Sequence, residues 1–174
     1  TLEGDQKKGV SSPIILPDLA VLDPELTLNL PRDITAATGI DAMVHAIEAF
    51  TSAHKKNPLS DLLAKEALRL LGSNIKVACS TPGDSDARSD MLLGSMYAGM
   101  AFANAPVAAV HALAYPIGSH FHVPHGLSNA MLLPTVTEFS IPTAAERYAD
   151  CARTMGAACE KDSTETANAK LLDE

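Results

Sequence analysis

The chain has 174 residues, of which 47% are hydrophobic and only 4% aromatic. This length suffices for one domain with a substantial core. The formal net charge of −8 argues against nucleic acid or an anionic membrane as a partner, because both are bound through basic patches. Ala, Leu and Met dominate the apolar residues, which favours closely packed helices. We therefore expect an all-α fold.

The first thirty residues differ from the rest, because prolines bound short apolar runs in 13–17 and 19–24. This pattern predicts one or two short strands and a linker, not a helix. The sequence begins at Thr1 with neither an initiator Met nor a basic leader. We therefore expect it to be the interior of a longer protein and not a targeting signal.

Beyond Pro31 the apolar residues follow a helical period. A first helix over 34–52 carries Ile40, Met43, Val44 and Ile47 on one stripe. Five further helices are predicted. The first begins at Pro58, and the second runs from Asp84 or Ser85 to about Ala103. The third surrounds His111, the fourth begins near His125, and the fifth runs from about Pro142 to Met155.

Two more signals mark the end of the chain. Gly156 is placed to end the helix that stops at Met155. Asp162 and Glu165 have capping-box spacing and predict the start of a last helix, with Asp162 as its cap.

The three cysteines, Cys79, Cys151 and Cys159, are odd in number and lack CxxC spacing. They are expected to be small buried hydrophobes in a reducing, cytoplasmic protein. No Asp, Glu, Lys or Arg occurs between Met91 and Thr137. Prolines and histidines interrupt this uncharged segment, so it does not have the pattern of a membrane span. We interpret it as the buried wall of an active site.

Four residues are candidates to bind one metal ion. Asp41 and His45 are four residues apart on a predicted helix, so both side chains lie on one face. His111 and His125 follow in the uncharged segment and complete a shell of four. Such a carboxylate–histidine pair also arises as a simple hydrogen bond on a helix face, so the pair alone is weak support.

The remaining histidines are open to other interpretations. His120 and His122 are alternates for the metal shell or polar lining, whereas His54 is expected in solvent. Three imidazoles and one carboxylate suit Fe(II), Zn(II), Mn(II) or Co(II), and the absence of thiolates argues against a structural zinc site. Gly39 costs about 1 kcal/mol in a helix interior, which predicts a close approach by another backbone or a ligand.

Several segments of the chain, from about Pro13 to Gly156, resemble the iron-containing (group III) alcohol dehydrogenases. They are Asp23-Pro24-Glu25-Leu26-Thr27, Thr38-Gly39-Ile40-Asp41-Ala42, His45-Ala46-Ile47-Glu48, Gly99-Met100-Ala101-Phe102-Ala103-Asn104, and His111 through Pro124-His125-Gly126. The resemblance implies a helical metal-binding domain of the dehydroquinate synthase-like type, with a short extended N-terminal segment.

The resemblance also implies a division of the chain. Residues 1–30 would be a linker and the remnant of an absent dinucleotide-binding domain. Residues 31–174 would be the metal-binding catalytic domain, truncated at its C-terminus. The family's metal ligands fall on Asp41, His45, His111 and His125, and Phe102 falls where an aromatic residue narrows the substrate pocket.

Two features depart from the family pattern. Tyr115 stands where many members have a histidine near the metal and the nicotinamide, so we place it in the substrate pocket beside Phe102. The Gly-rich loop that binds the cofactor phosphates is absent from these 174 residues, so no cofactor-binding residue can be assigned. NAD or NADP would be bound mainly by the absent domain.

The function implied is a metal-dependent NAD(P)-linked oxidoreductase that interconverts a small-molecule alcohol and an aldehyde or ketone. Fe(2+) is the expected ion, with Zn(2+) as the alternative, and a cytoplasmic homo-oligomer is expected. Two other interpretations stay open: a non-catalytic helical metal-binding module, and a zinc polyol dehydrogenase of the glycerol type.

Overall fold

The computed structural model describes residues 2–3, 6–7 and 12–173. At the N-terminus, strand β1 (Leu2–Glu3) pairs antiparallel with β2 (Gln6–Lys7). Two single turns of 3-10 helix follow, η1 (Pro13–Ile15) and η2 (Pro24–Thr27). Strands predicted between the prolines are therefore wrong. Proline fixes φ near the helical value and so favours the first position of a helical turn.

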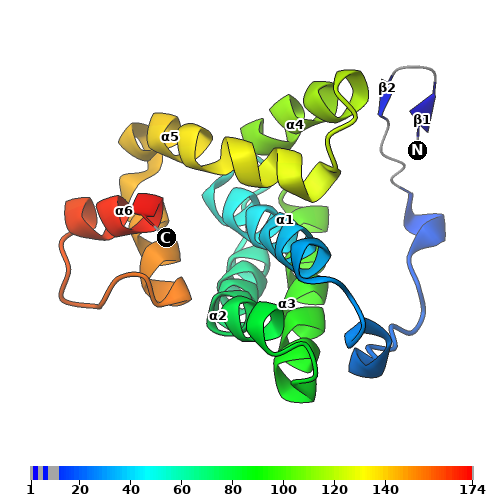
Figure 1. Cartoon of the computed structure of the whole chain (residues 1–174). Coiled ribbons are helices and arrows are strands. Elements are labelled where there is room, and N and C mark those ends of the chain that lie inside the picture. Colours follow the sequence, from blue (N-terminus) through cyan, green and yellow to red (C-terminus); the bar gives the residue numbers. More distant parts are fainter. Residues whose placement is uncertain (1, 4–5, 8–11, 174) are drawn as a thin grey trace.

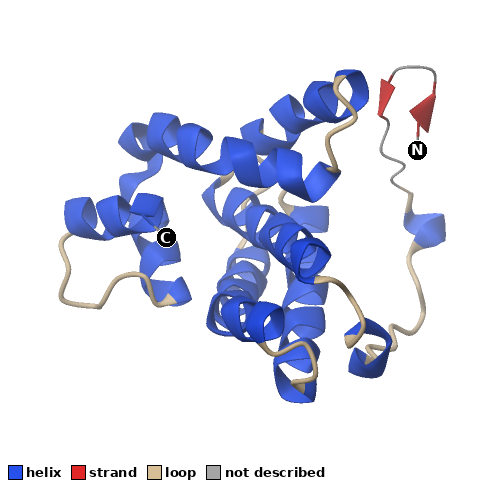
Figure 2. Cartoon of the chain, viewed as in Figure 1, coloured by secondary structure: helices blue, strands red, loops and turns tan. Residues whose placement is uncertain are grey.

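All other described elements are helices, which confirms the predicted all-α fold (Figure 2). They are α1 (Arg32–Thr51), α2 (Pro58–Ser80), α3 (Ser85–Asn104), α4 (Ala109–His120), α5 (His125–Met155) and α6 (Thr164–Asp173).

Most predicted helix starts are confirmed, including those of α2 at Pro58 and α3 at Ser85. Asp84 caps α3, since its side chain accepts a hydrogen bond from Ala87 N. Asp162 is wrong as the cap of α6: Ser163 Oγ accepts from Thr166 N instead, at 3.1 Å. The Asp162 carboxylate is engaged by Cys159 N at 2.8 Å and Lys170 Nζ at 2.7 Å.

The helix predicted over 142–155 is part of the longer α5. This helix is bent where Ala144 leaves helical geometry, with φ −144° and ψ 34°. Pro142 lies just before the bend and lacks the N–H needed to continue the ladder of hydrogen bonds. Gly156 ends α5 with φ 83°, as predicted.

Helix α1 occupies the centre of the molecule and packs against α2, α3 and α5 (Figure 1). Helices α4 and α6 both pack on α5, at its two ends. Alanine fills much of the buried space, and the fully buried larger side chains include Leu68, Leu71 and Val44. Small side chains let the helix axes approach closely, which brings residues of different helices to α1.

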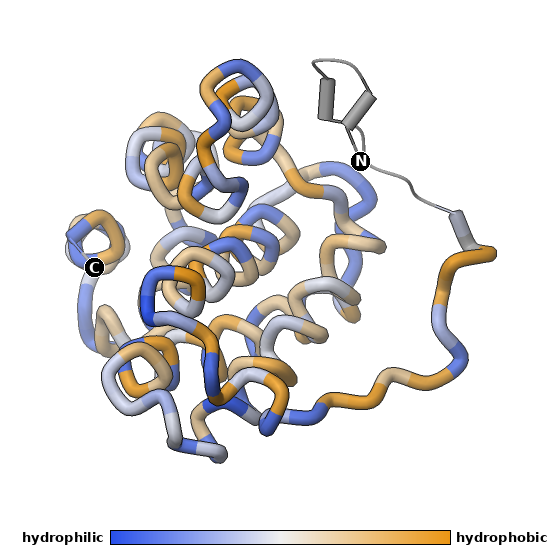
Figure 3. The backbone as a smooth tube through the Cα atoms, turned by 45° about the vertical axis from the view of Figure 1, so that its right-hand side comes forward, coloured by the Kyte–Doolittle hydropathy of each residue, from blue (hydrophilic) through white to orange (hydrophobic). Residues whose placement is uncertain are grey.

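The segment between η1 and α1 is apolar but extended along the edge of the molecule (Figure 3). Leu16, Leu19 and Val21 are each at least 77% exposed. Its turn η2 contacts α3. This exposure agrees with a short extended N-terminal segment, while the predicted domain boundary at residues 30 and 31 stays a prediction.

The uncharged segment between Met91 and Thr137 is only partly buried. His111, Ser128 and Asn129 are at most 2% exposed, but Phe121 is 74% and Met131 is 61% exposed. The interpretation of the whole segment as a buried wall is therefore wrong. Helix α4 and the first half of α5 lie at the periphery and turn one face away from the core (Figure 1).

The cysteines are all free thiols in different settings. Cys151 is buried as predicted, whereas Cys79 is partly exposed and Cys159 lies exposed in the turn before α6. The prediction that all three are buried is wrong for Cys159.

In the described part of the chain, no helix by itself has the length and apolar character to cross a membrane. Helices α3 and α4 reach that length and composition only as a pair, which is bent by 105°.

Candidate metal centre

One stripe of α1 carries three ionisable side chains, of which the last is buried and the other two are half-buried. Asp41, His45 and Glu48 are spaced i, i+4 and i+7, so they lie above one another on the same face. Gly39 lets neighbouring helices approach this part of α1. A Cβ atom there would lie 2.8 Å from Met91 Cε and 2.9 Å from Ile75 Cδ1. The predicted approach is therefore by side chains, and not by a backbone or a ligand.

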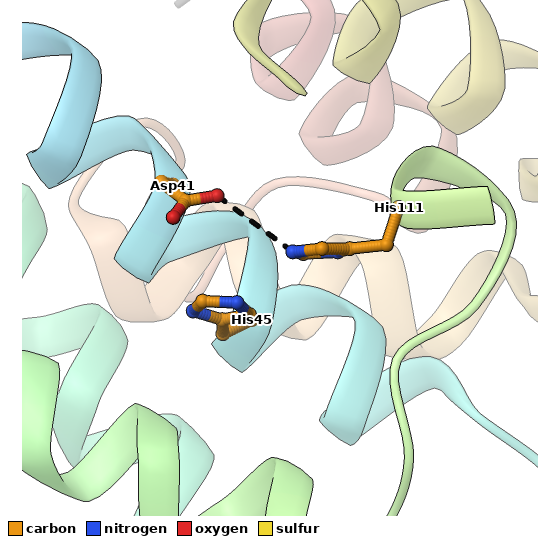
Figure 4. Close-up of side chains that lie close together, drawn as sticks. All are labelled: Asp41, His45 and His111. Atoms are coloured by element: carbon orange, nitrogen blue, oxygen red, sulfur yellow. Dashed lines mark ion pairs between the residues drawn. The ribbon is translucent and has the colours of Figure 1, made fainter. Parts of the chain in front are cut away.

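The structure brings Asp41 and His45 of α1 together with His111 of α4 (Figure 4). One ligand atom from each of the three lies within 4.8 Å of the others. Asp41 Oδ1 is 3.7 Å from His111 Nε2. The His45 and His111 rings stack with centroids 4.5 Å apart and planes 17° apart. The three side chains lie close enough together to hold one ion, and their role as metal ligands stays a prediction.

His125, the first residue of α5, approaches the cluster from another side. Its Nε2 lies 3.6 Å from Asp41 Oδ1, and its ring centroid is 5.4 Å from that of His111. Gly126 makes this approach possible, because a Cβ there would lie 2.3 Å from the Ala37 carbonyl oxygen. The four predicted ligands thus converge, although His125 stands outside the tight group of three.

The other histidines do not join this group. His54, His120 and His122 are exposed, and none of them belongs to the cluster found among the described residues. His54 is in solvent, as predicted. His120 and His122, the alternates for the shell, lie at the end of α4 and in the loop after it, so His125 is the better candidate.

Glu48 is a functional candidate that the sequence reasoning missed. It is 4% exposed, and Oε2 lies 2.6 Å from His111 Nδ1. A carboxylate accepts hydrogen bonds, so Nδ1 carries the hydrogen and Nε2 faces Asp41. A charged residue seven positions after Asp41, on an apolar helix face, was the available signal.

Asn129 was also missed. Its side chain is fully buried, and Nδ2 contacts Asp41 Oδ1 while lying 3.2 Å from His111 Nε2 and 3.4 Å from His125 Nε2. Asn129 follows His125 by one helical turn, which is the same spacing that relates Asp41 and His45. The amide therefore contacts three of the four candidate ligands.

The surroundings shift the pKa of each central group. Burial lowers the pKa of His45 to about 4, although the Asp41 charge opposes this. Burial also disfavours the charged form of His111, but Asp41 and Glu48 outweigh it and raise its pKa to about 9. Burial opposes ionisation of Asp41, yet His111, His45 and Asn129 together lower the pKa of its carboxyl.

These residues fit a divalent cation. His45 is uncharged at neutral pH, so its lone pair is available to a metal. The carboxylates of Asp41 and Glu48 favour positive charge at His111, which a cation beside Nε2 would supply in place of a proton. Imidazole and carboxylate together suit Fe(II) and Zn(II).

Aromatic rings flank the cluster. Phe102 stacks on His45 with centroids 4.6 Å apart, and Tyr115 lies parallel to His125 at 5.8 Å. Phe102 is half-buried, and Tyr115 is 38% exposed. Their role as pocket residues stays a prediction. A cavity of about 390 Å³ lies elsewhere, against Ile40 of α1 and against α2, α5 and α6.

Comparison with known proteins defines the class of this helical domain. Residues 35–173 match the sequence profile described as the Fe-containing alcohol dehydrogenase family, C-terminal. The chain belongs to this family. The resemblance inferred from the sequence motifs is thereby confirmed.

Individual relatives agree. The chain is 47% identical over 150 residues to long-chain-alcohol dehydrogenase 1 of Geobacillus thermodenitrificans, covering 86% of the chain and 38% of that protein. The crystal structure of a 1,3-propanediol oxidoreductase superposes with a TM-score of 0.83 at 40% identity, covering 87% of the chain and 39% of that structure. The structure of a sulfoacetaldehyde reductase from Bifidobacterium kashiwanohense in complex with NAD+ superposes with a TM-score of 0.75 at 30% identity. The match covers 87% of the chain and 39% of that structure. The chain thus spans about two fifths of the length of these relatives.

Proposed function

We propose that this chain is the metal-binding part of an oxidoreductase that interconverts an alcohol and an aldehyde or ketone with NAD or NADP. The observation that carries the proposal is the convergence of Asp41, His45 and His111, with His125 3.6 Å from Asp41. Membership of the Fe-containing family supports Fe(2+) as the ion. Zn(2+) is the alternative, since the same donor set suits it.

Each residue has a distinct task in this proposal. Asp41, His45, His111 and His125 would hold the ion, which supplies a Lewis acid that polarises the substrate oxygen. Glu48 keeps the His111 ring turned towards Asp41. The low pKa of His45 keeps that imidazole free of a competing proton.

Phe102 and Tyr115 are proposed to line the substrate pocket. Their rings lie against His45 and His125 respectively, so they border the cluster on two sides. Apolar rings beside a charged centre exclude water and strengthen its electrostatic interactions. We infer that they orient the carbon chain of a small alcohol or aldehyde.

The nicotinamide cofactor would be held mainly by a dinucleotide-binding domain outside these residues. The solved NAD+ complex of a relative supports NAD as a cofactor of this fold. Positioning two reactants can supply about 7–11 kcal/mol of barrier reduction. We therefore expect negligible NAD(P)-dependent turnover by the chain alone. The predicted cytoplasmic location and homo-oligomer stay predictions.

The test compares three proteins. They are the chain, a fusion in which the part of the G. thermodenitrificans relative that has no counterpart in the chain is joined to its N-terminus, and the Asp41→Ala variant of that fusion. Metal content is measured by elemental analysis and turnover of a primary alcohol by NAD(P)H formation. The fusion should be active and the variant inactive. Full metal content in both His45→Ala and His111→Ala would contradict the proposed ligand set.

The same experiment separates the alternatives. A fusion that binds metal but oxidises no alcohol would favour a non-catalytic metal-binding module. A fusion that prefers glycerol and retains activity only with zinc would favour a polyol dehydrogenase. Substantial metal-dependent turnover by the chain alone would show that the cofactor site lies within these residues.

A further inference from the structure

Glu48 is a buried carboxylate whose hydrogen bonds both go to one helix. Oε1 accepts from Val110 N at 2.7 Å, and Oε2 lies 2.6 Å from His111 Nδ1. Its side chain is 5% exposed. Burying a carboxylate is costly unless hydrogen bonds satisfy it. The two hydrogen bonds that satisfy the Glu48 carboxylate both lie in the first turn of α4.

The start of α4 lacks a cap of its own. Ala108 precedes the helix and its side chain makes no capping bond. The first N–H groups of a helix need acceptors, and the helix dipole favours a negative charge there. Glu48 meets both needs from α1, sixty-two residues away in sequence. The cap of α4 is thus supplied by the helix that carries Asp41 and His45.

The second oxygen of the same carboxylate fixes the ring of His111. With Nδ1 bonded to Glu48, Nε2 lies 3.7 Å from Asp41 Oδ1, on the side of the other candidate ligands. A histidine that ligates a metal commonly donates its other ring N–H to such a carboxylate, and loss of this partner typically costs about 10–100-fold in metal affinity.

We propose that Glu48 is a positioning residue that fixes the start of α4 and the His111 ring together, and so sets the metal affinity through His111. This inference rests on the proposed metal site. It goes further by assigning to Glu48 a role in ion binding without making it a ligand. A purely structural cap would affect the stability of α4 without acting through the His111 ring.

The variant Glu48→Gln tests this assignment. Glutamine has one oxygen and one NH2 group, so it cannot accept from both Val110 N and His111 Nδ1. We expect Zn(2+) affinity, measured by competition with a chelator, to fall about 10–100-fold. The matched control is Asp61→Asn. Asp61 is a half-buried carboxylate bonded to Lys56 and Arg147, and we expect this variant to keep the Zn(2+) affinity of the wild type.

A double-mutant cycle separates positioning from stability. In a His111→Ala background, Glu48→Gln should change Zn(2+) affinity by less than about twofold, because the residue through which it acts is gone. In a His125→Ala background it should keep its full effect. Equal losses in the two backgrounds would overturn the proposal, and so would wild-type affinity in Glu48→Gln itself.

Two further controls keep the result interpretable. Circular dichroism of each metal-free variant reports whether it folds. If Glu48→Gln does not fold, Glu48→Asp replaces it in the cycle, because Asp keeps the charge but is one methylene shorter and cannot reach both partners. A wild-type chain that binds no Zn(2+), Co(2+) or Fe(2+) would overturn the proposed function, and this assignment with it. Intact binding with an ineffective Glu48→Gln would overturn this assignment alone.

Discussion

Gly126 is the contact that places the start of α5, and therefore His125, against α1. A Cβ at Gly126 would lie 2.3 Å from the carbonyl oxygen and 2.7 Å from the carbonyl carbon of Ala37. Both atoms belong to backbone and cannot rotate away. The variant Gly126→Ala must therefore push the start of α5 off α1 or strain one of the two helices.

The expected cost follows from two opposing terms. Overpacking a closely packed site costs about 1–3 kcal/mol. Alanine recovers at most about 1 kcal/mol of helix propensity relative to glycine. Because the clash is with backbone, we expect a net loss of about 2 kcal/mol. For a chain of this length that lowers the melting temperature by about 4–8 °C.

Gly99 in α3 provides the matched control. It is also a glycine inside a helix, but a Cβ there would meet no atom within 4 Å. Gly99→Ala should therefore gain about 0.5–1 kcal/mol from helix propensity alone. The melting temperature should rise by about 1–4 °C, and Zn(2+) affinity should not change.

Thermal unfolding followed by circular dichroism, with and without Zn(2+), measures both variants. We also expect Gly126→Ala to weaken Zn(2+) binding, because ligand positions must hold to about 0.5 Å. If Gly126→Ala stabilises the chain as Gly99→Ala does, the close contact between α5 and α1 does not position His125. That result would refute the reasoning.

Three further predictions concern single residues. The hydrogen bond from Lys170 lowers the pKa of Asp162 from 3.8 to about 2. The ionised Asp162 carboxylate therefore contributes stability above about pH 4, and this contribution is lost towards pH 2. The variant Asp162→Asn should show a smaller change in melting temperature than the wild type between about pH 4 and pH 2. A maleimide should label Cys159 in the native chain, whereas Cys151, which is buried with its pKa raised to about 12, should react only after unfolding. Asn129→Leu removes the amide that donates to the half-buried Asp41 carboxylate. It should cost the metal-free chain about 1–3 kcal/mol, with a smaller loss when Zn(2+) is bound.

The sequence was most informative where the signal is local. Asp84 and Pro58 mark helix starts by chemistry that acts within one turn, and the structure has helices beginning at Ser85 and Pro58. The i, i+4 spacing of Asp41 and His45 likewise needs only the geometry of one helix. Asp162 is the exception among the local signals, because Cys159 N and Lys170 Nζ engage its carboxylate.

Predictions that depend on the environment of a segment did less well. The uncharged run from Met91 to Thr137 was interpreted as buried, yet Phe121 and Met131 face away from the described core. The absence of charge shows only that a charged side chain is disfavoured there. An uncharged composition does not show which part of the protein covers an apolar side chain. The exposure of Phe121 and Met131 therefore could not be derived from composition.

Glu48 and Asn129 show a limit of a different kind, because their signals were present but were not used. Each continues a stripe that begins with a candidate ligand: Glu48 lies seven residues after Asp41, and Asn129 lies four after His125. A polar residue on an otherwise buried helix face needs a partner. When the stripe already carries metal ligands, those ligands are the nearest polar groups, so the next polar residue along it is a candidate to orient them. In this chain that reasoning leads from Asp41 to the carboxylate that holds His111, and from His125 to the amide beside Asp41.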